Sequence, residues 1–228
     1  MQPLPRGRHW SPNMSSDRTR SFFDGYAADF GGIYNTSTGV FKNWINRTFR
    51  ASMMLRYAKT LEGCAPVEGK TVLDIGCGPG LYSVALAERG ARRVVGLDFA
   101  ESMVKLARER ADLAGVAGRC EFRNQDLFSF DERESFDYLI LMGLMDYMAE
   151  PGKVIEKVLK LVRSKAFLSF PVDGGFIAWQ RKLRYRRRCD LFLYTRRQIE
   201  ELFLPFSEAD VEIEDIAQDF FVTISRRA

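Results

Sequence analysis

The sequence predicts an α/β fold: a doubly wound, seven-stranded sheet that is mostly parallel and carries an antiparallel C-terminal hairpin. Two observations support this prediction. Between residues 70 and 172, five short apolar segments alternate with segments of helical periodicity, which is typical of a parallel sheet covered by helices on both faces. Two further strand-like runs are separated only by Ala217-Gln218, and so short a connection predicts a hairpin.

The elements are expected in a regular order. Residues 41–61 place apolar side chains at helical spacing. Five strands are expected at residues 71–75, 94–98, 120–124, 136–142 and 166–172. The helices between them are expected at residues 81–88, 103–113 and 151–162, the second marked by Met103, Ala107 and Leu113. A last helix at residues 195–203 precedes the hairpin strands at residues 210–216 and 219–225.

Composition limits the class of protein and its location. We expect a disordered tail at residues 1–20, a helical lid or cap at 21–66, and the main domain at 67–228, with a basic insertion near 176–194.

The apolar runs are shorter than the roughly 20 residues of a membrane span, and the tail lacks the apolar core of a secretory signal. The four cysteines form no C-x-x-C pair, which favours a reduced, cytoplasmic location. The only histidine, His9, lies in the tail, so neither a histidine triad nor a metal site is expected.

Three glycines stand where the first strand is expected to turn into a helix: Gly76, Gly78 and Gly80. Glycine allows unusual backbone dihedrals there and lets a ligand approach closely. The positive end of the following helix favours an anionic group. A dinucleotide-binding loop of the G-x-G-x-x-G type would need glycine at position 81, where this chain has Leu81.

Acidic residues stand at the ends of three successive strands. Asp74 lies inside the end of the first, Asp98 ends the second, and Asp126 follows the third. The carboxyl ends of parallel strands face one crevice, where Asp98 could accept from both hydroxyls of a ribose. Asp126 could accept from an adenine amino group beside the apolar Leu127. Each such bond contributes roughly 1.5–3 kcal/mol. The alternative is that these acids are ordinary polar strand ends.

These motifs resemble those of the class I S-adenosylmethionine-dependent methyltransferases, which have a Rossmann-like fold. Residues 72–80, Val-Leu-Asp-Ile-Gly-Cys-Gly-Pro-Gly, are similar to the first motif of the family. Residues 95–99 are similar to its second motif, 124–127 to its third and 136–140 to its fourth-strand motif. The C-terminal hairpin also matches. More distantly, residues 22–26 and 142–147 resemble methyltransferases that act on small molecules.

The resemblance implies S-adenosylmethionine as cofactor and S-adenosylhomocysteine as product. The loop glycines would hold the methionine part, and Asp74 would approach its amino group directly or through water. Asp98 would bind the ribose and Asp126 the adenine amino group. The other residues implied to contact the cofactor are Cys77, Phe99, Met103, Leu127, Met142 and Tyr26, the last as part of a lid. Ala100 stands where the family often has a serine that caps the following helix. The absence of that cap should lower helix stability by about 1 kcal/mol.

The acceptor is expected above the end of the fourth strand, at residues 142–147. The chain has neither an N-P-P-Y motif there nor a Pro-Cys dipeptide, and both absences favour a small or lipid-like acceptor over nucleic acid. If the reaction needs a base, Asp146 and Tyr147 are the nearest candidates. Alternatively, Asp146 caps the following helix and Tyr147 only packs.

A basic stretch at residues 181–188 carries six cations, whereas the whole chain has a net charge of +4. With Arg47, Arg50 and Arg56 it could form a positive entrance for an anionic acceptor or a membrane surface. Nucleic acid would use the same charge, and a solvated basic helix remains the alternative. The predicted function is therefore methyl transfer to a small, anionic or lipid-like acceptor. Two alternatives are a cofactor-holding module that binds RNA or a protein, and a nicotinamide-dependent oxidoreductase.

Overall fold

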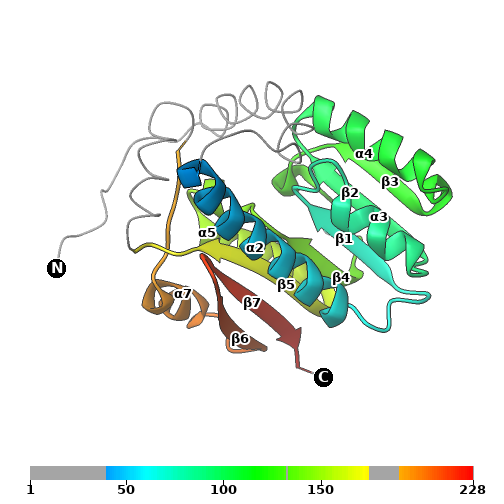
Figure 1. Cartoon of the computed structure of the whole chain (residues 1–228). Helices are drawn as coiled ribbons and strands as arrows, with labels where there is room; N and C mark the ends of the chain where they lie inside the picture. Colours follow the sequence, from blue (N-terminus) through cyan, green and yellow to red (C-terminus); the bar gives the residue numbers. More distant parts are fainter. Residues whose placement is uncertain (1–39, 132, 175–189, 228) are drawn as a thin grey trace.

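A computed structural model of the chain describes residues 40–131, 133–174 and 190–227. Seven strands form one sheet in the order β3-β2-β1-β4-β5-β7-β6 (Figure 1). Their bounds are β1 Thr71–Ile75, β2 Arg93–Asp98, β3 Cys120–Asn124, β4 Phe136–Leu141, β5 Val162–Pro171, β6 Ala209–Ile216 and β7 Asp219–Arg226. Strands β1 to β5 pair with one another in parallel, and β7 is antiparallel to both β5 and β6. The predicted Rossmann-like fold with its antiparallel hairpin is confirmed.

Helices cover both faces of the sheet. Helices α2 (Val40–Gly63), α3 (Leu81–Glu88) and α4 (Glu101–Leu113) lie on one face, where α3 contacts both of the others (Figure 1). Helices α5 (Pro151–Leu161) and α7 (Arg196–Phe203) pack on the other face. Three short 3₁₀ helices complete the elements: η1 Ala117–Arg119, η2 Leu127–Ser129 and η3 Met145–Tyr147.

The core is divided by the sheet because successive residues of a strand point to opposite faces. Leu73 of β1 and Leu168 of β5 belong to the apolar cluster under α5 and α7. Val72 and Phe167, their neighbours in sequence, belong to the cluster under α2 and α3. All four are buried, and such doubly covered strands explain why the sequence shows continuous apolar runs rather than alternation.

Two elements differ in detail from the prediction. Strand β5 begins at Val162, directly after α5, four residues earlier than expected. Leu113, one of the apolar residues that mark α4 in the sequence, is 91% exposed. Six residues after the buried Ala107, it is rotated by about 240° around the helix axis, so it points away from the sheet.

Several expectations lie outside the described residues. These are the tail at 1–20, the part of the cap before residue 40, Tyr26, and the basic stretch at 181–188. Within the described ranges, no helix combines the length and apolar character needed to cross a membrane. In the same ranges, no group of three or more His, Cys, Asp or Glu side chains is arranged to hold a metal ion.

Candidate active site

The glycine loop joins β1 to α3 in a conformation that favours glycine. Gly76, Gly78 and Gly80 have φ values of 71°, 51° and 75°, in the left-handed region that other residues rarely adopt. A Cβ placed on Gly78 would meet no atom within 4 Å, whereas one on Gly80 would lie 3.0 Å from the Cβ of Ala107 in α4. Gly80 is therefore needed for packing, and Gly78 leaves open space beside the loop for a ligand.

Asp98 is fixed against this loop by backbone N–H groups. Its Oδ2 accepts a hydrogen bond from the Gly78 N–H at 2.9 Å, and its Oδ1 accepts from the Ala100 N–H at 2.9 Å. The N–H groups of Gly76 and Cys77 both donate to the carbonyl oxygen of Leu97, at 2.8 and 2.9 Å. These contacts hold the Asp98 carboxylate at the glycine loop, where the sequence predicts a ribose-binding acid.

Asp74 lies below the N-terminal end of α3. Its Oδ2 accepts from Ser83 Oγ at 2.6 Å, and the Ser83 backbone also donates to this carboxylate. Burial raises the pKa of Asp74 to about 7, against the opposing effect of the two Ser83 hydrogen bonds. The sequence analysis missed Ser83. Its contact makes Asp74 a cap for α3, whose own N-cap residue, Gly80, has no side chain to provide one.

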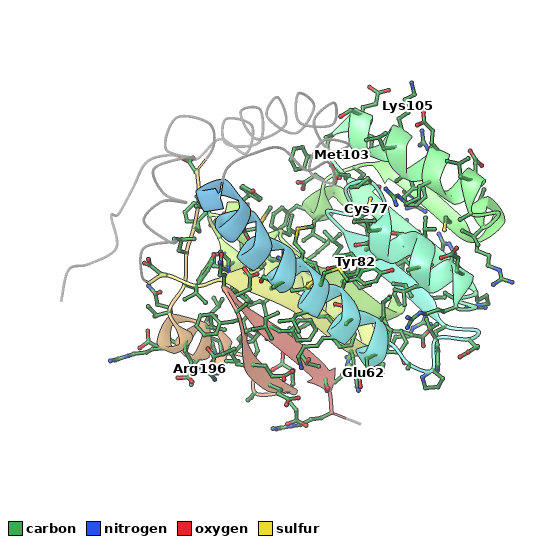
Figure 2. All side chains as sticks on the ribbon, viewed as in Figure 1. Glu62, Cys77, Tyr82, Met103, Lys105 and Arg196 are labelled. Atoms are coloured by element: carbon green, nitrogen blue, oxygen red, sulfur yellow. The ribbon has the colours of Figure 1, made fainter. Side chains whose placement is uncertain are left out.

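The predicted adenine-binding residues lie after β2 and β3. The Gln125 N–H donates to the Asp98 carbonyl oxygen at 3.0 Å, which links the two strand ends. Asp126 is exposed and caps η2, accepting from the Phe128 N–H at 2.7 Å. Leu127 and Met103 are buried, and Phe99 is half-buried. Figure 2 labels Cys77 on the glycine loop, Met103 on α4 and Tyr82 on α3.

The predicted acceptor residues follow β4. Met142 and Tyr147 are half-buried, and Asp146 is buried within η3. Helix α5 begins at Pro151 with Glu150 at its N-cap position, so Asp146 is not the N-cap residue of that helix. Leu144, one of the predicted acceptor residues, lies beside the glycine loop, with its Cδ1 3.2 Å from a Cβ placed on Gly76.

A buried polar cluster, missed by the sequence analysis, lies between α2 and the sheet. Arg56 Nη1 donates to Ser169 Oγ at 3.2 Å, and Arg56 Nε is 3.6 Å from Asp219 Oδ2. Ser52 donates to the same Asp219 oxygen. The expected place of Arg56 at a positive entrance is therefore wrong: it is 7% exposed and faces an acid inside the protein. The sequence signal was the polar series Ser52, Arg56 and Thr60, which recurs every four residues along one buried face of α2.

Tyr82 lies between the glycine loop and this cluster. It is the second residue of α3, and its ring centroid is 5.5 Å from that of Tyr57 on α2. Burial raises the pKa of Tyr82; the charge of Arg56 opposes this rise and that of Asp74 adds to it. Tyr82 therefore remains a neutral phenol at physiological pH, and it is a further candidate for contact with ligands.

Comparison with known proteins gives consistent matches. Residues 66–170 match a family model described as a methyltransferase domain. A ubiquinone biosynthesis O-methyltransferase of Neisseria meningitidis is 36% identical over 113 residues, which are 48% of this chain and 47% of that protein. The mitochondrial ubiquinone biosynthesis O-methyltransferase of Arabidopsis thaliana is 30% identical over 165 residues, 68% of this chain and 51% of that protein. The chain thus spans about half the length of these curated relatives.

Solved structures share the fold. Magnesium protoporphyrin IX methyltransferase from Synechocystis with bound S-adenosylhomocysteine has a TM-score of 0.74 at 19% identity, covering 93% of this chain and all of that one. The 1,6-didemethyltoxoflavin-N1-methyltransferase of Burkholderia thailandensis has a TM-score of 0.67 at 17% identity, covering 98% of this chain and 94% of that one. At such identities the likeness shows the fold alone.

Proposed function

We propose that this chain, a member of the class I S-adenosylmethionine-dependent methyltransferases, transfers a methyl group to an oxygen of a small acceptor. The observation that carries the proposal is the Gly78–Asp98 contact at the cofactor loop, beside open space at Gly78. S-adenosylmethionine is the cofactor of this family, and its sulfonium supplies an electrophilic methyl group. Transfer to oxygen is supported by the relatives named as ubiquinone biosynthesis O-methyltransferases.

The residues of this chain fit that cofactor. Asp98 would accept from the ribose hydroxyls while the Gly78 and Ala100 N–H groups hold its carboxylate in place. Asp126 would bind the adenine amino group, with Phe99, Met103 and Leu127 around the ring. The glycine loop, Cys77 and Met142 would surround the methionine part. Asp74, with its pKa near neutrality, would hold the cofactor amino group through water, since Ser83 covers its carboxylate.

The acceptor would lie beside the residues that follow β4. Good alignment of two reactants can lower a barrier by about 7–11 kcal/mol. The main role of the residues after β4 would therefore be to place the acceptor oxygen in line with the methyl group. Asp146 or Tyr147 would take the proton that the acceptor hydroxyl loses. A small acceptor with an anionic or lipid-like part agrees with the net charge of +4. The matches above give no support to the binding-module and oxidoreductase alternatives.

Calorimetric titration tests the cofactor assignment. The protein is titrated, free of bound ligand, with S-adenosylmethionine, S-adenosylhomocysteine and, as a negative control, NADH. We expect micromolar dissociation constants for the two sulfur ligands only. Asp98→Ala should weaken both by about 10- to 150-fold, because it removes charged hydrogen bonds worth roughly 1.5–3 kcal/mol. Asp112→Ala, which removes an exposed carboxylate on α4, is the matched control and should bind as the wild type.

The oxygen assignment needs a separate experiment. Formation of S-adenosylhomocysteine is followed with catechol, and then with analogues carrying an amine or a thiol in place of the hydroxyl. Methylated product from the hydroxyl compound alone supports O-methylation. Tight cofactor binding combined with transfer only to nitrogen or sulfur would retain the family assignment and reject oxygen as the acceptor atom.

A further inference from the structure

Four buried polar side chains and one backbone turn form what we call the Arg56 network: Ser52, Arg56, Gly143, Ser169 and Asp219. Its side chains come from α2, β5 and β7, and each is at most 7% exposed. Buried ion pairs are often no more stabilising than apolar residues of similar volume, but in some proteins they fix a specific arrangement. The arrangement fixed here is of interest because one end of the network reaches the acceptor side.

Ser169 connects Arg56 to the turn after β4. Its Oγ accepts from Arg56 Nη1 at 3.2 Å and from the Gly143 N–H at 2.8 Å. A hydroxyl oxygen has two lone pairs, so these donors use both. Gly143 has a φ of 76°, and a Cβ placed on it would lie 3.7 Å from Arg56 Nη1. The guanidinium group therefore lies beside the turn. It also donates to Ser169 Oγ, the atom that accepts the hydrogen bond of the Gly143 N–H.

Asp219 and Ser52 hold the other side of the guanidinium group. Asp219 begins β7, and its Oδ2 is 3.6 Å from Arg56 Nε while also accepting from Ser52. Arg56 is thus fixed from two strands at once, by Ser169 on β5 and by Asp219 on β7. A lysine could reach one of these partners but lacks the fork geometry that reaches both.

The Gly143 turn leads to both parts of the candidate active site. The side chain of the next residue, Leu144, lies beside the glycine loop, with its Cδ1 3.2 Å from a Cβ placed on Gly76. The residues after it form η3, which carries Asp146 and Tyr147. A shift of about 1 Å in such a turn is enough to disturb the alignment of two reactants. The position of this turn therefore sets the acceptor side relative to the cofactor loop.

We propose that Arg56 is a positioning residue for methyl transfer: acting through Ser169, it fixes the Gly143 turn and so holds the acceptor side against the cofactor loop. The inference rests on the proposed function, because it takes the residues after β4 as the acceptor side. Arg56 has no hydrogen bond to the glycine loop or to Asp98 among the described residues. Its loss should therefore affect alignment of the acceptor and leave cofactor affinity nearly unchanged.

Hydrogen exchange of single backbone amides tests this in the whole protein. In Arg56→Met and in Ser169→Ala, the Gly143 amide should exchange at least about tenfold faster, because its hydrogen bond is weakened or removed. The exchange rates of amides in the centres of β5 and β7 should change much less, relative to wild type, than that of Gly143. Compared with Arg56→Met, Arg56→Lys should recover the overall stability but only part of the protection of the Gly143 amide from exchange. Lys59→Met, on the same helix, removes a half-buried ion pair with Glu214 of β6 and should leave Gly143 unchanged.

Cofactor binding and turnover separate the possible outcomes. S-adenosylhomocysteine affinity should stay within about twofold of wild type in both variants, whereas kcat with the hydroxyl acceptor should fall by about tenfold or more. If Gly143 exchange changes only in step with the β5 and β7 amides, Arg56 is merely structural and the inference is wrong. If the wild type itself binds no S-adenosylhomocysteine, the proposed function fails, and that result does not depend on Gly143. Arg56→Lys keeps the test of Arg56 valid if Arg56→Met does not fold.

Discussion

At the scale of single residues, the protonation of Asp74 makes the stability of the fold depend on pH. The buried carboxylate is surrounded by little water, and burial raises its pKa to about 7, compared with about 3.9 in an unfolded chain. The folded state therefore binds this proton more tightly than the unfolded state does. The resulting stabilisation is fully present below about pH 4 and is lost as the pH rises through about 7.

We therefore expect the free energy of unfolding to fall between pH 5 and pH 8, by about 1.4 kcal/mol for each pH unit below the folded-state pKa of about 7 and by less above it. Asp74→Asn, which cannot ionise, should give a flatter profile. Urea denaturation at four pH values measures this, with the exposed Asp112→Asn as control. If the free energy of unfolding depends on pH in the same way in the wild type and in Asp74→Asn, Asp74 does not hold a proton in the folded protein near neutral pH.

At the scale of elements, the helices around the site are capped differently from α7. Gly80 and Ala100, the N-cap residues of α3 and α4, make no side-chain cap bond. Asp74, from β1, supplies a carboxylate to α3 instead. Helix α7 lies on the opposite face of the sheet and begins with a full capping box, in which Thr195 and Gln198 bond to each other's backbone.

The capping box predicts a local contribution to stability. Thr195→Ala should lower the free energy of unfolding by about 1 kcal/mol, because the N–H of Gln198 loses its partner. Thr195→Ser keeps the hydroxyl and should retain most of the wild-type value. Chemical denaturation measures both, and cofactor affinity should be the same in both variants because α7 does not border the cofactor loop. Equal loss in the alanine and serine variants would show that the hydroxyl is not responsible.

At the scale of the whole molecule, a ligand that binds only the folded state should raise the melting temperature. S-adenosylhomocysteine at about 100 times its dissociation constant adds about 2.7 kcal/mol. For a domain of this size that corresponds to a rise of about 5–10 °C. Differential scanning fluorimetry measures the shift. Asp98→Ala should remove most of it at the same ligand concentration, and a full shift in that variant would speak against Asp98 as a ribose ligand.

The sequence predicts the sheet well, and it locates the glycine loop and the acids at the strand ends, because these signals are local. The glycine loop and the acids at strand ends lie next to the strands that position them, so periodicity and spacing are sufficient. The Arg56 network has no such signal. Arg56 meets Ser169 across 113 residues of sequence, and Ser52 meets Asp219 across 167. Arg56 was expected at an exposed entrance because a cation on a helix is usually solvated, and only the fold shows the acid that pairs with it.

The order of the last strands has a consequence for synthesis on the ribosome. Strand β7 lies between β5 and β6 although it follows both in the chain (Figure 1). Until about residue 226 has emerged, β5 has an unpaired edge, and at roughly 5–20 residues per second this period lasts several seconds. An unpaired edge of this kind is a template for wrong pairing. The nascent chain should therefore be most dependent on chaperones between the completion of β5 and the arrival of β7, the strand that also brings Asp219 to Arg56.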